Sequence, residues 1–368
     1  MTLDHLAQTT RLAQDLIRID SRSHVSNAAI ADRLQPELRG FEIERLRYTD
    51  PAGIAKHVLV AARGWSGLAL CGHMDTVPET GWTQHPFDPR IEGDTLHGLG
   101  SADMKGPLAA MVVAMRSMPP RMPVALFLTT DEETTKQGAR VLLQSELARR
   151  YRPRAFLIAE PTLMIPVRGH RASVAITAIA FGVQVHSSIG RGRNANWALI
   201  PFLAEVQALQ NRLLTSPVWQ DPAYDPPHGD LNLVVDNHGT AVNVTVARAT
   251  ARIKFRFSAS LDPAPILEAI RTAAARAGLH LIEQPEGPAP ELAPTHRLIQ
   301  IAEKISRHKA HTAPYGTDAV VLQKLAPCVL LGPGDIGVAH TPHEHTSLSA
   351  LAKAVPTFVN MAKAVAAG

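Results

Sequence analysis

The sequence contains few cysteines. Only Cys71 and Cys328 occur among 368 residues, and each lies within an apolar run. This count excludes a cysteine-rich structural zinc site. Buried, reduced thiols are the simpler interpretation, and they are expected in a reducing cytoplasm.

The sequence also lacks a long hydrophobic segment. No stretch is long and apolar enough to span a bilayer. The N-terminal residues 1–21 carry Asp4 and Asp15 among their apolar residues. This pattern predicts an amphipathic helix and lacks the uninterrupted apolar core of a signal peptide. We therefore expect a cytoplasmic protein with no membrane partner.

A concentrated basic surface is missing as well. The formal net charge is +4, but Lys and Arg are scattered along the chain and are not interleaved with aromatic residues. No nucleic-acid partner is therefore expected, although a small anionic substrate would suit this charge.

Several short apolar runs are present, and they do not alternate with polar residues. Such runs are typical of strands that are covered on both faces. They comprise residues 57–62, 68–73, 124–130, 155–160 and 328–334. Helical segments lie between them, one after Asp103 and one at residues 144–150. This succession predicts an α/β fold, a mostly parallel sheet with helices on both faces.

The middle of the chain has a different pattern. In residues 250–260 apolar residues alternate with basic ones, which predicts a strand with one solvated, basic face. A helix with Asp262 as its N-cap and Gly278 as its stop is expected next. The proline-rich residues 284–294 then indicate a crossing to another domain, after which Thr295 can cap a further helix.

These patterns predict a discontinuous domain organisation. The larger α/β domain comprises residues 1–172 and 290–368, and a smaller α+β domain of residues 173–289 interrupts it.

Polar residues follow the carboxyl ends of the predicted strands, where ligands bind in open parallel sheets. Two histidines and several carboxylates are expected to converge there: His73, Asp75, Asp103, Asp131, Glu132, Glu133, Glu160 and His340. Imidazoles and carboxylates suit zinc or a similar divalent ion, and a carboxylate can bridge two ions.

The spacing suggests separate roles for neighbouring residues. On an extended chain His73 and Asp75 lie on the same side, so that Asp75 can accept the ring N–H of His73 and fix its tautomer. Capping of a turn is the alternative role for Asp75. The adjacent Glu132 and Glu133 must point apart, so that one can bind a metal while the other faces a water as general base.

Five motifs, GHMDTVP, GLGSADMKG, TTDEE, AEPT and AHTPHE, occur in this order. Together they resemble the co-catalytic zinc amidohydrolase and exopeptidase family that includes acetylornithine deacetylase and succinyl-diaminopimelate desuccinylase. The likeness covers nearly the whole chain. It implies two divalent metal ions, zinc or alternatively cobalt. The ligands that it implies are His73, Asp103, Glu133, Glu160 and His340.

The resemblance also implies roles within this set. Asp103 would bridge the two ions. His73 and Glu160 would complete the ligands of one ion, and Glu133 and His340 those of the other. Glu132 would be the general base, and Asp75 would orient the histidine.

The smaller domain resembles the family's ferredoxin-like lid, which mediates dimerisation, so the resemblance implies a homodimer. His186 stands at the position of the histidine that reaches the partner subunit's site and supports the oxyanion. Arg256 stands at the position of the carboxylate-binding arginine, and Asn243, Thr317 and Asp318 are further candidates for substrate binding.

Alternative interpretations exist for two of these features. Arg252 and Lys254 share the face of Arg256, so this face can be a simple solvated charged surface. GLGSADMKG contains glycines of a dinucleotide-binding loop, but Asp103 stands where that fingerprint needs glycine. The zinc-protease motif H-E-x-x-H is absent.

Within the family, PVRGHR and LGPGDIGVAHTPHE are most similar to acetylornithine deacetylase and its acetylcitrulline-cleaving relatives. The resemblance therefore implies hydrolysis of an N-acyl amino acid, with N2-acetylornithine giving ornithine and acetate in arginine biosynthesis. Succinyl-diaminopimelate, acetylcitrulline and small peptides are alternative substrates. A non-catalytic metal-binding protein on the same scaffold is the alternative of another class.

Overall fold

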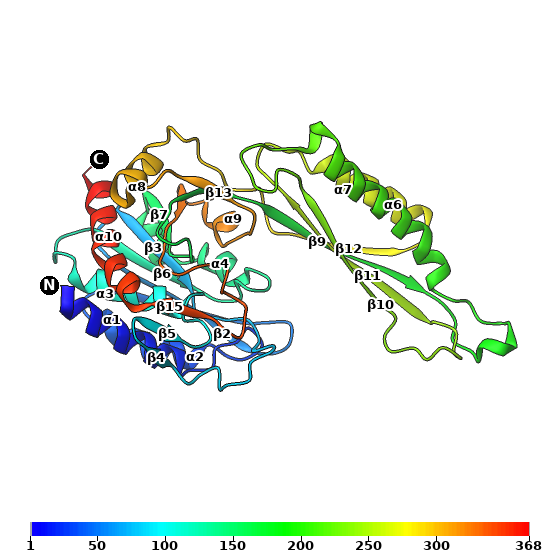
Figure 1. Cartoon of the computed structure of the whole chain (residues 1–368), viewed down its shortest axis with the longest axis horizontal. Coiled ribbons are helices and arrows are strands. Elements are labelled where there is room, and N and C mark those ends of the chain that lie inside the picture. The colour runs from blue at the N-terminus through cyan, green and yellow to red at the C-terminus, as the bar shows by residue number, and fades with distance from the viewer. Residues whose placement is uncertain (1, 368) are drawn as a thin grey trace. The chain divides into compact units, whose positions relative to one another are not determined.

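The structure, a computed structural model, describes residues 2–367 and divides into two compact units (Figure 1). The larger unit comprises the residues up to Gly169, Leu292–His311 and the residues from Thr317 onward. The smaller unit comprises His170–Glu291 and Thr312–Gly316.

The sequence pattern predicts domain boundaries at 172/173 and 289/290. It therefore predicts that residues 312–316 belong to the larger domain. The structure places these five residues in the smaller unit. There Thr312 donates a hydrogen bond to the main-chain oxygen of Ala223. Gly316 lies against the main-chain oxygen of Arg171. Both contacts are non-local, so the local sequence pattern did not indicate them.

Most of an eight-stranded sheet lies in the larger unit. Its strands are β1 (Glu42–Thr49), β2 (Ala55–Arg63), β3 (Leu68–His73), β6 (Val124–Thr129), β7 (Ala155–Ile158), β8 (Val167–His170), β13 (His311–Ala313) and β14 (Cys328–Leu330). Their order in the sheet is β1-β2-β6-β3-β7-β14-β8-β13. The central strands β6, β3, β7 and β14 are parallel, whereas β1, β2 and β8 pair antiparallel with their neighbours. The predicted α/β fold with a mostly parallel sheet is confirmed.

The central strands are buried on both faces because their side chains alternate between two apolar layers. Leu68 and Leu70 belong to the main hydrophobic core. On the opposite face the rings of Phe127 and Phe156 pack edge to face, with centroids 5.3 Å apart. This double burial explains why these strands have uniformly apolar sequences.

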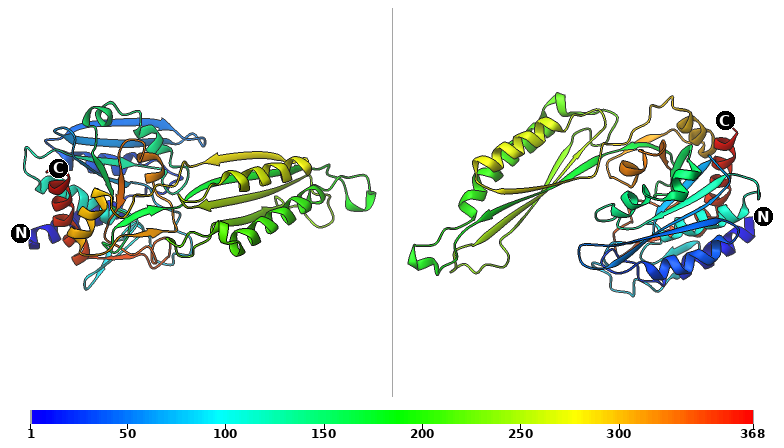
Figure 2. Two further views of the ribbon diagram at one scale, coloured as in Figure 1. Left: turned by 90° about the horizontal axis from the view of Figure 1, so that it is seen from above. Right: turned by 180° about the vertical axis from the view of Figure 1, so that it is seen from behind.

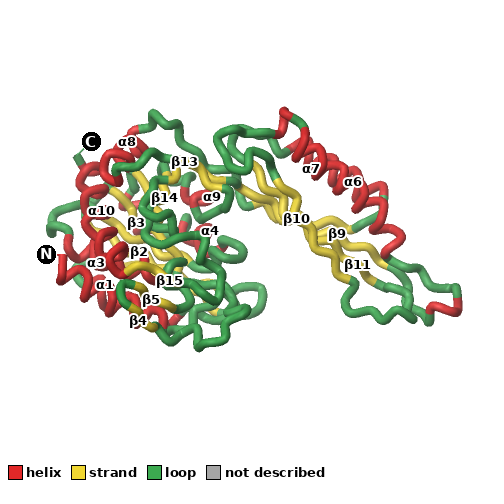
Figure 3. The backbone as a smooth tube through the Cα atoms, viewed as in Figure 1, coloured by secondary structure: helices red, strands yellow, loops and turns green. Residues whose placement is uncertain are grey.

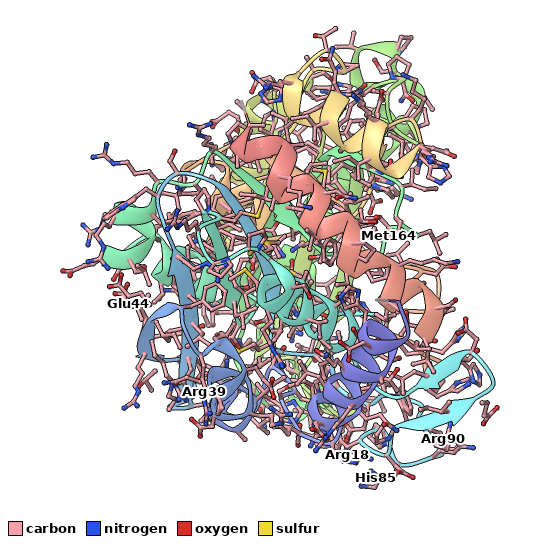
Figure 4. All side chains as sticks on the ribbon, turned by 90° about the vertical axis from the view of Figure 1, so that its left-hand side faces the viewer. Arg18, Arg39, Glu44, His85, Arg90 and Met164 are labelled. Carbon is pink, nitrogen blue, oxygen red and sulfur yellow. The ribbon has the colours of Figure 1, made fainter. Side chains whose placement is uncertain are left out.

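Helices cover both faces of this sheet (Figure 3). Helices α1 (Thr2–Ile17), α3 (Lys105–Ser117) and α10 (Leu348–Ala366) pack against one another in the main core (Figure 4), together with α2 (Ala28–Leu34) and α8 (Arg297–Ser306). The short helices α4 (Gln137–Leu142) and α5 (Glu146–Tyr151) contact β1 and β2 from the other side. Helix α9 (Ala319–Leu322) contacts α4.

A small three-stranded sheet, order β15-β5-β4, flanks this unit. Its strands are β4 (Arg90–Glu92), β5 (Thr95–His97) and β15 (His345–Ser347). It joins the segment before Asp103 to the segment after His340, because Gly98 N–H donates to the main-chain oxygen of Glu344.

The smaller unit has the chain order β9 (Ala172–Phe181), α6 (Asn196–Thr215), β10 (Asp230–Asp236), β11 (Arg248–Phe257), α7 (Ala264–Arg276) and β12 (His280–Pro285). The antiparallel sheet has the order β10-β11-β9-β12, and both helices lie on one face of it (Figure 2). This β-α-β-β-α-β arrangement is ferredoxin-like, as the resemblance implied. Short 3-10 helices occupy Gln35–Leu38, Ser187–Ile189 and Pro217–Trp219.

Among the residues that the structure describes, no helix is long and apolar enough to cross a membrane.

Candidate metal centre

The candidate ligands in the larger unit come from the carboxyl ends of neighbouring strands. His73 is the last residue of β3, Glu133 follows β6, and Glu160 follows β7. Asp103 lies just before α3, and His340 lies in the loop after β14. The parallel pairing of these strands brings segments that are far apart in the sequence to one edge of the sheet.

The side chains form a compact cluster around Asp103. One carboxylate oxygen of Asp103 lies 3.0 Å from His73 Nε2, and the other lies 3.4 Å from His340 Nε2. His340 Nε2 also lies 3.0 Å from Glu133 Oε1. Asp103 thus stands between two histidines that are 267 positions apart along the chain (340 − 73). Asp103 therefore contacts both candidate histidine ligands.

His73 is held by the main chain of Asp75. Its Nδ1 lies 2.9 Å from the main-chain oxygen of Asp75 and 3.5 Å from the Asp75 carboxylate. The sequence had predicted the carboxylate as acceptor, but the main-chain oxygen is the closer one. With Nδ1–H donated to this oxygen, Nε2 is left as the ligand atom that faces Asp103.

The Asp75 carboxylate has other partners. It accepts a hydrogen bond from Ser23 Oγ at 2.9 Å, and the main-chain N–H groups of Glu132 and Glu133 lie 3.3 Å from its oxygens. Asp75 therefore connects the segment of His73 to the segment of the two glutamates.

Glu132 and Glu133 have different partners, as their adjacency predicted. Glu133 faces His340, whereas Glu132 Oε1 lies 2.6 Å from Lys136 Nζ. Lys136 also donates to the main-chain oxygen of Glu132 at 3.0 Å, and both side chains are buried. The carboxylate of Glu132 is thus paired with a cation that the sequence had not singled out.

Burial and mutual repulsion dominate the pKa values of the glutamates in this cluster. Burial and the nearby charge of Asp103 raise the pKa of Glu133 to about 7. The same two causes raise the pKa of Glu160 well above its usual value. Hydrogen bonds to Asp103 and Glu133 raise the pKa of His340 to about 11.

The pKa values of Asp103 and His73 are shifted in the direction opposite to the effect of burial. Burial would raise the pKa of Asp103, but hydrogen bonds from His340 and His73 hold it well below its usual value. Burial would lower the pKa of His73, but hydrogen bonds to Asp103 and Asp75 raise it. The imidazoles with raised pKa values thus lie beside Asp103, whose pKa is lowered, whereas the pKa values of Glu133 and Glu160 are raised.

This donor set fits divalent cations. Three carboxylates and two imidazoles converge, and bound cations would replace the protons that now neutralise them. Among residues 2–367, one group alone has ligand atoms that all lie within 4.8 Å of one another, namely His73, Asp103 and Glu133. Oxygen and nitrogen ligands in these proportions are those of zinc and similar divalent ions.

Asp318 is buried behind this edge of the sheet. Thr129 Oγ1 donates to one of its oxygens at 2.5 Å, and burial followed by the charge of Glu132 raises its pKa to about 7. Thr317 Oγ1 accepts from the N–H of Ala319. Both residues are at least 98% buried, so the predicted substrate contacts of this pair stay a prediction.

Three further candidates lie in the smaller unit. His186 is exposed, and its Nδ1 lies 2.7 Å from Ser188 Oγ. It is close to Asn243, whose main-chain oxygen accepts from Ser187 N–H. Arg256 projects from β11 and lies 3.7 Å from Asp230. The structure does not test the substrate contacts predicted for these three residues.

Two buried residues of the larger unit were missed by the sequence analysis. Lys136 contacts Glu132, and Glu344 binds the main chain of the segment that carries Asp103. Glu344 belongs to the quoted motif AHTPHE, so the motif was a signal, but no role could be attached to it.

Comparisons with known proteins find similarity over most of the chain. Residues 69–364 match the model of peptidase family M20/M25/M40. The acetylornithine deacetylase of Proteus mirabilis is 31% identical over 346 residues, which cover 90% of this chain and 88% of the relative. That of Photorhabdus laumondii is 33% identical over 339 residues, which cover 88% and 87%.

Solved structures share the fold. An M20 family metallo-carboxypeptidase from Sulfolobus solfataricus has a TM-score of 0.75 at 15% identity, covering 98% of this chain and 100% of that chain. A dinuclear metal-binding peptidase of the M20 family from Bacillus subtilis has a TM-score of 0.64 at 17% identity, covering 98% of each chain.

The fold, the carboxylate–histidine cluster and these similarities define a metal-dependent amidohydrolase. The chain belongs to peptidase family M20/M25/M40.

Proposed function

We propose that this protein hydrolyses the amide bond of an N-acyl amino acid, with N2-acetylornithine as the first candidate, giving ornithine and acetate. The observation that carries the proposal is the position of Asp103 between His73 and His340, with Glu132 beside the cluster. The similarity to acetylornithine deacetylases over about nine-tenths of the chain supports this choice of substrate.

The residues of the larger unit would bind the metal ions and transfer the proton. His73, Asp103 and Glu160 would hold one divalent ion, and Asp103, Glu133 and His340 the other; zinc is proposed, with cobalt as the alternative. When bound, such ions make a water more acidic and polarise a carbonyl group. Glu132 takes a proton from the attacking water and returns it to the leaving amine as the C–N bond breaks. Lys136 holds the Glu132 carboxylate while it is charged.

Residues of the smaller unit are proposed to contact the substrate. Arg256 would bind the α-carboxylate of the substrate, ideally as a bidentate pair. His186 would support the oxyanion in the partner subunit's site, and Asn243 would contact the substrate. The exposure of the Arg256 side chain, 38%, supports this assignment because a guanidinium must reach its ligand.

We also propose a homodimer formed through the smaller unit. Strand β10 is an edge strand of its sheet, and its Leu233, Val234 and Val235 are exposed. Beside it lies an apolar groove of about 480 Å³, lined mainly by α6 and β10 and including Ile200 and Leu231. An exposed apolar edge of this kind is normally covered by another chain.

The test is a hydrolysis panel with the purified full-length protein, loaded with zinc or cobalt. Acetylornithine, acetylcitrulline, succinyl-diaminopimelate and a small peptide are compared at matched concentrations by release of the free amine. We expect acetylornithine to have the highest kcat/KM. Preference for another member of the panel would reassign the substrate, and absence of hydrolysis in all cases, together with bound metal, would favour a non-catalytic metal-binding protein.

A further inference from the structure

Glu344 binds the main chain of the segment that presents Asp103. Its Oε1 accepts hydrogen bonds from the N–H groups of Ala102 and Asp103, and its Oε2 accepts one from Gly100. All three distances are 2.9 Å, and the residue is only 1% exposed. One carboxylate thus satisfies three buried N–H groups in residues 100–103.

These bonds matter because the three donors are buried. A buried N–H without a partner is costly. Residues 100–103 lie outside any helix or strand, so these N–H groups have no ladder partner. The path of this segment, and with it the position of Asp103, therefore depends on Glu344.

Glu344 lies in the same loop as His340. The N–H of Glu344 donates to the main-chain oxygen of Thr341, which closes a turn directly after His340. Because the other end of Glu344 binds the N–H of Asp103, a single residue joins the backbones of two candidate ligands. Their side chains approach to 3.4 Å in this structure.

We propose that Glu344 is a positioning residue that holds Asp103 and His340 at the separation needed to share a cation. This inference rests on the proposed two-metal function. The cation held by Asp103, Glu133 and His340 is the more sensitive one, because two of its three ligands depend on this contact. Residues behind metal ligands typically contribute about 10–100-fold to metal affinity.

The test compares zinc binding by metal-free Glu344→Gln and Glu344→Ala with that of the wild-type protein. A chromophoric chelator competes for the metal at a temperature where circular dichroism shows every variant to be folded. The weaker of the two binding steps should lose affinity roughly 10–100-fold. Wild-type affinity in both folded variants would overturn the proposal, as would failure of the wild-type protein to bind zinc.

Glu44→Gln is the matched control. Glu44 lies on the edge strand β1 (Figure 4) and also accepts N–H bonds, from Leu147 at 2.8 Å and Glu146 at 3.3 Å. Its loss should lower the unfolding midpoint of the metal-free protein without changing zinc affinity. An equal loss of zinc affinity in Glu44→Gln would show that general destabilisation, and not positioning, is measured.

A measurement on the wild-type protein covers the case in which neither Glu344 variant folds. In the metal-free protein the amide hydrogens of Gly100, Ala102 and Asp103 should be protected from exchange. Exchange of all three at the unprotected rate would overturn the proposal. Zinc affinity and substrate turnover are separate readouts. If zinc affinity depends on Glu344 but the wild-type protein hydrolyses no substrate, the proposed function is refuted and the positioning role of Glu344 is not.

Discussion

At the scale of single residues, the account assigns proton transfer to Glu132. Glu132→Gln should lower kcat by about 10²–10⁴-fold, because a positioned general base contributes that much and an amide cannot take up a proton. Bound metal should be unchanged, since Glu132 pairs with Lys136 and not with the ligand cluster. The two readouts are steady-state kinetics and metal content. Turnover at the wild-type rate would refute the assignment.

Lys136 gives a second prediction at this scale. Lys136→Met removes the ammonium group that lies 2.6 Å from the Glu132 carboxylate. We expect kcat to fall by about tenfold at unchanged KM, because a charged pair of this kind contributes on the order of 1.4 kcal/mol to holding the base. Lys136→Arg should retain more activity than Lys136→Met. Lys353→Met, at an exposed position, is the control. If Lys136→Met lowers only KM or only the metal content, Lys136 does not act by holding the Glu132 carboxylate.

The protonation of the metal-free cluster predicts how metal binding responds to pH. The pKa of Glu133 is raised to about 7 and that of His340 to about 11, so both bind protons near neutrality without metal. Ligands must lose these protons to coordinate a cation, so zinc affinity should rise from about pH 6 to about pH 8. Calorimetry in buffers of different ionisation enthalpy measures the released protons. Equal affinity at both pH values without proton release would be inconsistent with this cluster.

The meeting of these side chains could be predicted from the sequence because each belongs to a recognisable motif, and their role as metal ligands stays a prediction. The roles of Lys136 and Glu344 could not be predicted in this way. Glu344 acts on main-chain groups 241 to 244 positions away, and main-chain N–H groups leave no signature in the residue types. Similarly, the main-chain oxygen of Asp75, which any residue at that position would provide, is the nearer acceptor for His73 Nδ1.

At the scale of secondary-structure elements, the position of Glu160 depends on the close approach of the segments that follow β14 and β7. A Cβ at Gly332, just beyond β14, would lie 2.3 Å from the main-chain oxygen of Ala159 and 2.5 Å from that of Glu160. Gly332→Ala should therefore destabilise the fold by about 1–3 kcal/mol and displace Glu160. Urea unfolding of the metal-free protein measures the first effect.

Gly337→Ala is the comparison for this substitution. The three atoms nearest to a Cβ there all belong to the Asp335 side chain, at 3.2 Å or more, and none is a main-chain atom. Equal stability of Gly332→Ala and the wild-type protein would show that the strands can separate at little cost.

Strands with uniformly apolar sequences were predictable, and short elements were not. The runs that became β3, β6 and β7 have the burial on both faces that their composition indicated. The three-residue strands β4, β5 and β15 have too few positions for a periodic pattern. Helix α8 was predicted to have Thr295 as its cap, but the cap is His296, whose Nδ1 accepts from Leu298 N–H. Threonine is the more common N-cap residue, but here the side chain of the neighbouring histidine accepts the hydrogen bond.

At the scale of the whole molecule, the proposed homodimer depends on the apolar edge of the smaller unit. Leu233→Glu places a charge in the groove between α6 and β10 and should convert the dimer to monomers in sedimentation velocity, because burial of an unpaired charge is costly. Ile282→Glu is the control, since Ile282 is similarly exposed but lies on the opposite edge strand, β12. A wild-type monomer, or a dimer that survives Leu233→Glu, would contradict this interface.

The central claim is that Asp103 joins two cations at one edge of the larger sheet. Its most direct test is anomalous diffraction from crystals of the full-length protein grown with zinc. The account predicts two peaks about 3.5–4 Å apart, one on either side of the Asp103 carboxylate. Absence of a peak at His73, Asp103 and His340, or a single peak that does not touch Asp103, would contradict it.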